Sequence, residues 1–189
     1  MNNLVKIGEK YMKKKLKVLG ISVLSLILVL IIGIGMIFKG EIRTLISFKQ
    51  LNEHPFYEMT YHADYNLDEF LINGAATDNE LVSFVTKQIL KGVSFDVNPD
   101  GACSTFIATN LEDENLFGRN FDYVHSIGLI VRTQPKNGYK SISLVNLNHL
   151  GLSLENMPTK NLINRIVTLA APYAPLDGMN EKGLAIGVL

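Results

Sequence analysis

The segment from Val18 to Phe38 constrains this chain more than any other, because its 21 consecutive residues carry no charge. They consist of Val, Ile, Leu, Gly, Ser, Met and Phe. A helix of this length spans about 31 Å, which matches the ~30 Å hydrocarbon core of a bilayer. A helix also satisfies its own backbone hydrogen bonds, so it crosses lipid without a partner. The segment 18–38 is therefore predicted to be a transmembrane helix.

Lysines flank the N-terminal side of this apolar run. Residues 1–17 hold six lysines against one acidic residue, Glu9, which gives a net charge of +5. A basic flank faces the cytoplasm, which predicts a single-pass protein of the cell membrane with a cytoplasmic tail and an extracellular body. A cleaved signal peptide is one alternative, but its apolar core spans only about 7–15 residues. A buried core helix is the other, and it needs neither 21 uncharged positions nor a lysine flank.

The overall composition excludes several classes of protein. Lys+Arg and Asp+Glu number 18 each, and residues 39–189 carry a net charge of −5, so we expect no nucleic-acid partner held by a basic surface. A hydrophobic fraction of 47% with 19% charged residues excludes a disordered chain. The single cysteine, Cys103, excludes an intramolecular disulfide and a cysteine-based zinc site. The four histidines lack metal-ligand spacing and there is no phosphate-loop motif, so no cofactor is expected.

Residues 39–102 are interpreted as a stalk or leader ahead of the domain. Thr77 and Glu80 have the spacing of a capping box, and apolar residues then follow at helical intervals up to Ile89. Gly92 is a natural stop. One helix is predicted over about 78–91.

The chain after the turn Pro99-Asp100-Gly101 alternates strands and turns, which is typical of the α+β class. We predict a helix over about 160–170 and a tight turn at 180–183 that leads into the apolar run 184–189. Strands are predicted at 103–108, 116–119, 127–133 and 139–145.

Cys103 is the first candidate for a catalytic residue. A lone cysteine is often just a small buried apolar side chain. This one begins a predicted strand behind the small residues Gly101 and Ala102. Cutting the bond before it would free a thiol nucleophile and an α-amine, whose usual pKa of about 7.7–8.0 suits a general base. A Cys–His pair with His125 or His149 is the alternative.

Arg119 and Asp122 follow at the end of the next predicted strand, which would pair with the Cys103 strand in a hairpin. An arginine beside the thiol would stabilise a thiolate and hold a substrate oxygen. An aspartate nearby could accept hydrogen bonds from the α-amine and orient it. The alternative is a surface ion pair that contributes about 0–1 kcal/mol.

Three blocks together resemble the choloylglycine hydrolase family of linear amide C–N hydrolases, which includes bile salt hydrolases and penicillin V acylases. They are residues 103–105, 116–122 and 177–184, in this order. The resemblance implies an N-terminal nucleophile (Ntn) hydrolase fold, a four-layer αββα sandwich, and autoprocessing that exposes Cys103 as the nucleophile. It places Arg119 and Asp122 beside that nucleophile and implies an acyl amide substrate, such as a conjugated bile salt, penicillin V or a fatty-acyl amide. The third block is interpreted as a structural turn with Gly183 at a positive φ.

The family pattern continues beyond this third block with an oxyanion-hole asparagine, so residues 103–189 correspond to the N-terminal part of the domain. We expect activity to require residues beyond 189, a completing second chain or a homo-oligomer. A membrane-anchored, catalytically inactive fragment or interaction module is the alternative function, and a thiol-exchange role for Cys103 comes third.

Overall fold

The chain divides into two units, Met1–Lys39 and Gly40–Leu189. The computed structural model describes residues 2–97, 102–123 and 126–188. The predicted turn Pro99-Asp100-Gly101 therefore lies outside the described residues.

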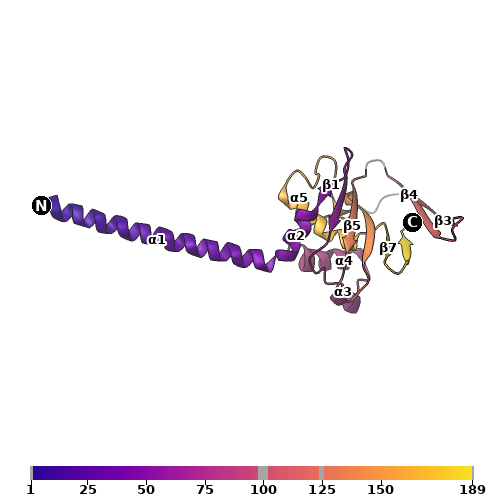
Figure 1. Ribbon diagram of the computed structural model, residues 1–189, viewed down its shortest axis with the longest axis horizontal. Coiled ribbons are helices and arrows are strands. Elements are labelled where there is room, and N and C mark those ends of the chain that lie inside the picture. Colours follow the sequence, from indigo (N-terminus) through magenta and orange to yellow (C-terminus); the bar gives the residue numbers. More distant parts are fainter. Residues whose placement is uncertain (1, 98–101, 124–125, 189) are drawn as a thin grey trace. The chain divides into compact units, whose positions relative to one another are not determined.

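Helix α1 (Asn2–Ile37) makes up the first unit and runs without interruption, as Figure 1 shows. Of the helices in the described part of the chain, it alone is long and apolar enough to cross a membrane. The apolar segment lies within Met12–Ile37 and is not buried against other parts of the protein. The predicted helix over 18–38 is present and begins earlier than expected, because six of the residues 2–17 are lysines, which favour helices. An exposed N-terminal apolar helix is typical of a membrane anchor or a signal sequence.

The rest of the chain belongs to the α+β class, as predicted, and is built on a mixed six-stranded sheet plus a two-stranded hairpin. The α-helices are α2 (Lys39–Ser47), α3 (Leu67–Asn73), α4 (Asp78–Phe84) and α5 (Leu162–Val167), with a π-helical turn at Val85–Ile89 and 3₁₀ helices at Leu147–Leu150 and Thr168–Tyr173. The strands are β1 (Lys49–Gln50), β2 (Phe56–Thr60), β3 (Ala102–Thr109), β4 (Asn115–Asp122), β5 (Gly128–Thr133), β6 (Ser141–Asn146), β7 (Asp177–Asn180) and β8 (Ala185–Gly187).

The six-stranded sheet has the order β1-β2-β5-β6-β7-β8. Strands β2 and β5 run parallel, with Phe56 opposite Gly128 and Thr60 opposite Arg132, and the other neighbours are antiparallel. The segment 39–102, interpreted from the sequence as a stalk or leader, thus supplies β1, β2 and three helices to the same unit as residues 103–189. In β2 Tyr57 and Met59 are buried and their neighbours less so, so alternate side chains of this strand face the core.

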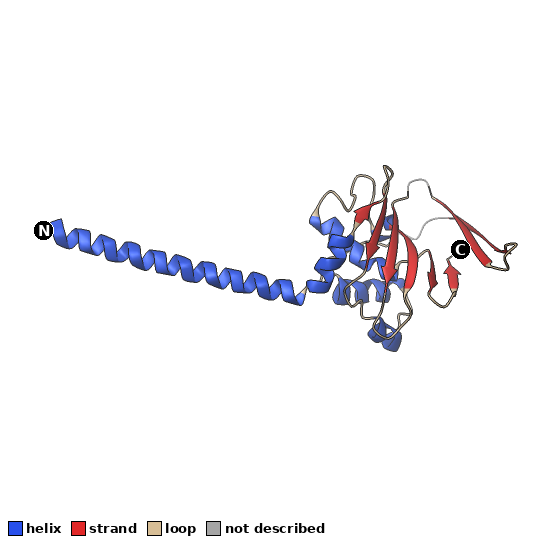
Figure 2. Cartoon of the chain, in the orientation of Figure 1, coloured by secondary structure: helices blue, strands red, loops and turns tan. Residues whose placement is uncertain are grey.

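The hydrophobic core lies on one face of this sheet. Side chains alternate along a strand, and in β5 Leu129 and Val131 are fully buried while Ile130 is only half-buried. Val85 and Leu169, from the helical segments, join the same core. Figure 2 shows the helices gathered on this side of the strands. Each fully buried aliphatic side chain of this kind stabilises the fold by about 1.5–3 kcal/mol.

The predicted helix over 78–91 is present as α4 followed by the π-helical turn. Thr77 accepts a hydrogen bond from the backbone N–H of Glu80, and the Glu80 carboxylate accepts one from the N–H of Ala76, one residue earlier than a capping box requires. Gly92 follows the helix with a φ of +96°, a conformation that favours glycine.

Candidate active site

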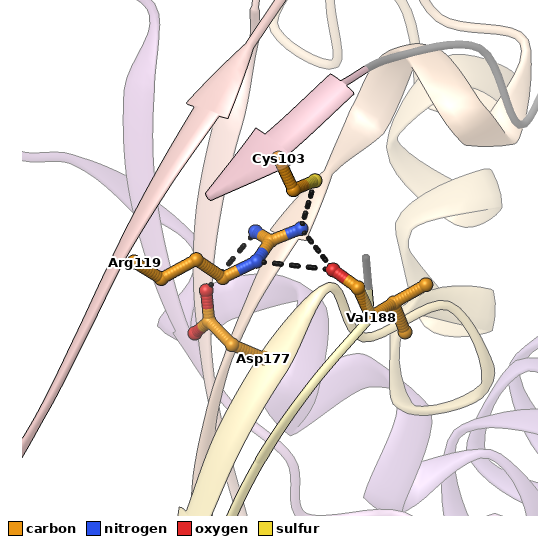
Figure 3. A network of polar contacts seen from close by, with 4 residues as sticks. All are labelled: Cys103, Arg119, Asp177 and Val188. Atoms are coloured by element: carbon orange, nitrogen blue, oxygen red, sulfur yellow. Dashed lines mark hydrogen bonds and ion pairs between the residues drawn. The ribbon is translucent and has the colours of Figure 1, made fainter. Parts of the chain in front are cut away.

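The hairpin of β3 and β4 brings Cys103 and Arg119 onto one face. The register pairs Cys103 with Phe121 and Thr105 with Arg119, and side chains paired across strands point to the same side. Cys103 and Arg119 are therefore diagonal neighbours. The Arg119 Nη2 donates a hydrogen bond to the Cys103 Sγ at 2.8 Å, as Figure 3 shows.

Residues outside the hairpin hold the Arg119 guanidinium in place. Its Nη1 lies 3.2 Å from the Asp177 Oδ2, and its Nη2 and Nε donate to the carbonyl oxygen of Val188 at 2.8 and 3.3 Å. The guanidinium carbon also lies 5.3 Å from the centre of the Phe121 ring. The Arg119 side chain is only 4% exposed, so the 23% exposed Asp177 carboxylate provides the charge that compensates it.

The turn between β7 and β8 positions both of these partners. Gly183 has a φ of +82°, which confirms the positive φ predicted for it. The Asn180 Oδ1 accepts hydrogen bonds from the N–H groups of Lys182 and Leu184, and this closes the turn. The returning strand places Gly187 opposite Asp177, so the next residue, Val188, presents its carbonyl beside the Asp177 carboxylate.

Gly187 allows the hairpin to lie close to β8. A Cβ at this position would stand 3.0 Å from the Phe117 Cζ and 3.4 Å from the Arg119 Cδ. Phe117, Arg119 and Phe121 lie on the same face of β4, and Phe121 is paired with Cys103. The close approach of Gly187 to this face therefore affects where the Arg119 guanidinium lies.

Asp122, the third residue predicted for the site, lies on the opposite face of the hairpin. Its Oδ1 accepts a hydrogen bond from the Asn120 Nδ2 at 2.6 Å. In the register it stands opposite Ala102, the residue immediately before Cys103. The structure thus brings together Cys103 and Arg119, and places Asp122 beside the backbone that leads into the thiol.

Asp177 is the residue of this candidate site that the sequence analysis missed, since the block 177–184 was interpreted only as a structural turn. Its partner Arg119 lies in a separate small sheet, so local patterns carry no information on the pairing. The sequence does carry one signal for it, because Asp177 is an acidic residue at the start of 177–184, one of the three blocks on which the family resemblance rests.

His149, one of the two histidines considered for a Cys–His pair, packs against aromatic rings near the hairpin. Its ring centre lies 5.7 Å from that of Phe121 and 6.2 Å from that of Tyr123. The other histidine, His125, lies outside the described residues. Within residues 2–97, 102–123 and 126–188 there is no group of three His, Cys, Asp or Glu side chains that could hold a metal.

A groove of about 310 Å³ borders the partners of Arg119. Asp177 and Val188 line it, and its remaining surface is largely apolar, with Leu176, Leu184 and Ile186 among the contributors. Cys103 is half-buried, and the groove reaches its partner Arg119 through Asp177 and Val188. A fixed guanidinium beside an apolar groove can hold an oxygen of a partly apolar ligand.

Comparison of this chain with protein-family models, with curated proteins and with solved structures gives no match.

Proposed function

We propose that the body of this protein is the N-terminal part of a cysteine-dependent hydrolase of linear amide C–N bonds, similar to the choloylglycine hydrolase family. The observation that carries the proposal is the 2.8 Å contact between the Arg119 Nη2 and the Cys103 Sγ. A structural cysteine needs no such contact, whereas a nucleophilic cysteine is activated by a neighbouring cation.

In the proposed reaction the Cys103 Sγ attacks the carbonyl carbon of the amide. The C–N bond breaks, the amine leaves with a proton, and a thioester remains on the sulfur. Water then attacks the thioester and releases the carboxylic acid and the thiol. Arg119 stabilises the thiolate before attack, and the ion pair with Asp177 holds its guanidinium in position.

The base in this proposal is the α-amine of Cys103, freed by autoprocessing of the Ala102–Cys103 bond. Asp122 supports this role because it stands opposite Ala102 in the register, at the point where the new N-terminus would form. Its carboxylate would orient the amine through a hydrogen bond. The substrate is an acyl amide, such as a conjugated bile salt, penicillin V or a fatty-acyl amide.

We further propose that the hairpin β3–β4 begins the second sheet of an Ntn-type αββα sandwich, which residues beyond 189 or a second chain would complete. The outer face of the six-stranded sheet supports this, because the half-buried Ile130 and Leu144 and the exposed Ile142 line a groove there. Apolar positions on an open sheet face are typically covered by a further layer.

The apolar helix α1 is proposed to be an uncleaved signal anchor in the cell membrane. The lysines of residues 1–17 would then face the cytoplasm and residues after 38 the exterior.

The proposal is tested in detergent micelles, on the chain together with the residues or the second chain that complete the domain, by mass spectrometry and by turnover of the three substrate types. We expect a new N-terminus at Cys103 and a thioester adduct at its sulfur, both absent in Cys103→Ala. Ser104→Ala is the matched control, because Ser104 lies on the opposite face of β3. An uncut chain that hydrolyses amides, or turnover that survives Cys103→Ala, would overturn the proposal.

A catalytically inactive, membrane-anchored module is the second candidate. It is favoured by Ala102, which is itself the first residue of β3 and pairs with Asp122, so that the uncut chain already forms a complete hairpin. This candidate predicts an intact chain of 189 residues and no thioester in the same experiment.

A further inference from the structure

Helix α1 is longer than a membrane requires. Its 36 residues span about 54 Å at 1.5 Å per residue, whereas the hydrocarbon core is ~30 Å thick. The uncharged run 18–38 fills that core, so the helical turns of residues 2–17 extend beyond it on the N-terminal side. Those turns carry six lysines.

Most of these lysines fall on one stripe of the helix. Lys6, Lys10, Lys13 and Lys17 follow one another at intervals of four, three and four residues, which are the intervals of neighbours on a helix face. Lys14 lies at the edge of the same stripe, within a sector of about 100°. Lys13, Lys14 and Lys17 are exposed. We call these five positions the lysine stripe.

The remaining positions of residues 4–17 are mainly apolar, and they occupy the other sectors of the helix. The apolar or aromatic ones are Leu4, Val5, Ile7, Tyr11, Met12 and Leu16, and Gly8, Glu9 and Lys15 lie among them. Five of the six lysines thus share one face of the helix, and Lys15 lies on the other.

The lysine stripe lacks enough acidic residues to balance it. Like charges three and four residues apart repel each other and destabilise an isolated helix. Glu9 is the one acidic residue among residues 1–17 and cannot neutralise five lysines. A negatively charged surface alongside the helix would remove this repulsion, and the leaflet adjoining an inserted span is the surface within reach.

We propose that the lysine stripe of α1 binds the headgroups of anionic lipids in the membrane leaflet next to residue 18. The inference rests on the proposed insertion of α1 in the membrane. The binding is electrostatic, so it selects negative headgroups over zwitterionic ones and weakens as salt is added. It is independent of the chemistry at Cys103.

The test reconstitutes the full chain in phosphatidylcholine vesicles that contain a minor share of phosphatidylserine. Electron paramagnetic resonance of spin-labelled lipids measures which lipid the protein holds at its surface. We expect phosphatidylserine to be selected several-fold over phosphatidylcholine, and the selection to fall towards unity when Lys6, Lys10, Lys13, Lys14 and Lys17 are all changed to Gln. Changing the same five lysines to Arg should retain it.

A matched control changes five lysines of the body to Gln, at positions 87, 91, 136, 140 and 160, and should leave the selection unchanged. Equal retention of the two lipids by the wild-type chain, or loss of selection in the control, would overturn the proposal. Resistance to carbonate extraction reports insertion separately. If the chain resists extraction but shows no lipid selection, only the proposal that the lysine stripe binds anionic lipids is refuted. If the chain is extracted, the proposal that α1 is a membrane anchor is refuted.

Discussion

The Asp177 carboxylate lies 3.2 Å from the Arg119 Nη1, and the same guanidinium contacts the Cys103 sulfur through its other terminal nitrogen. The ion pair thus joins the six-stranded sheet, through β7, to the hairpin that carries the thiol. Removing the carboxylate leaves a 4% exposed cation without its charge partner.

Asp177→Asn is therefore expected to destabilise the body by about 1–3 kcal/mol, below the values for fully buried pairs because the carboxylate is partly exposed. Urea unfolding of the full chain in detergent, followed by circular dichroism, measures the change. Asp122→Asn is the matched control, since its exposed carboxylate accepts from the neighbouring Asn120 side chain, and we expect a change within about 0.5 kcal/mol. Equal effects of the two variants would contradict a supporting role for Asp177.

Arg119→Gln should slow the alkylation of Cys103 several-fold, because the charged donor that lies 2.8 Å from the sulfur is lost. Cys103 is the one cysteine of the chain, so iodoacetamide incorporation measured by mass spectrometry reports it alone. Arg132→Gln, which removes an exposed arginine from β5, is the control and should leave the rate unchanged. An unchanged rate in Arg119→Gln would show that the contact does not activate the thiol.

Gly187→Ala is expected to displace the hairpin from β8, because the added Cβ would stand 3.0 Å from the Phe117 ring. Overpacking of this kind costs about 1–3 kcal/mol. Unfolding free energies of Gly187→Ala, Phe117→Ala and the double variant form a cycle in which the double variant should lose less stability than the sum of the single ones. If the changes in unfolding free energy of the two single variants simply add in the double variant, residues 187 and 117 do not clash.

Alkaline pH is expected to unfold the body through buried tyrosines. Burial raises the pKa of Tyr61 and of Tyr173, whose hydroxyls donate to the backbone carbonyls of Leu169 and Tyr65. A tyrosine whose pKa is raised in the folded state contributes its full stability at any pH below the ordinary tyrosine pKa of about 10. That contribution is lost as the pH rises from about 10 towards the folded-state pKa.

Tyrosinate absorbance and circular dichroism recorded together along a pH titration test this expectation. We expect part of the tyrosinate absorbance to appear only when the circular dichroism signal of the folded body is lost. Tyr61→Phe should reduce the loss of stability above pH ~10, at the cost of about 1 kcal/mol at neutral pH for the unpaired carbonyl of Leu169. Complete ionisation of the tyrosines in a folded chain would contradict the prediction.

A cut between residues 102 and 103 should leave the two pieces together. Strand β2 lies between β1 and β5, so residues 1–102 would remain in the sheet through five paired positions with β5 and through buried side chains such as Tyr57 and Val85. A protease site placed at 98–101 in the full chain allows the test whether or not autoprocessing occurs. After cleavage the pieces should co-elute in detergent and separate in urea, whereas separation without denaturant would refute the prediction.

The sequence allowed prediction of the elements whose signals are local. The uncharged run 18–38, the Thr77 cap and the Gly183 turn depend on neighbouring residues, and all three are present. The contact between Cys103 and Arg119 follows from one hairpin with a short turn, so it too could be anticipated.

Strand β2 and the pairing of Asp177 with Arg119 could not be predicted in the same way. Strand β2 is only five residues long and pairs in parallel with a strand far along the chain, so its position depends on the tertiary fold. The Asp177 partner is selected by how β7 and the hairpin meet, which periodicity does not encode.

The parallel pairing of β2 with β5 also bears on the order of events during biosynthesis. The crossover that joins these two strands contains β3 and β4, so the thiol and the proposed cleavage point lie inside the connection itself. While that connection is intact, β5 meets β2 as part of one chain, and closing the loop costs only entropy that grows slowly with its length. A cut made earlier would turn the same pairing into an encounter between separate molecules that depends on their concentration. The proposed processing is therefore expected to follow folding.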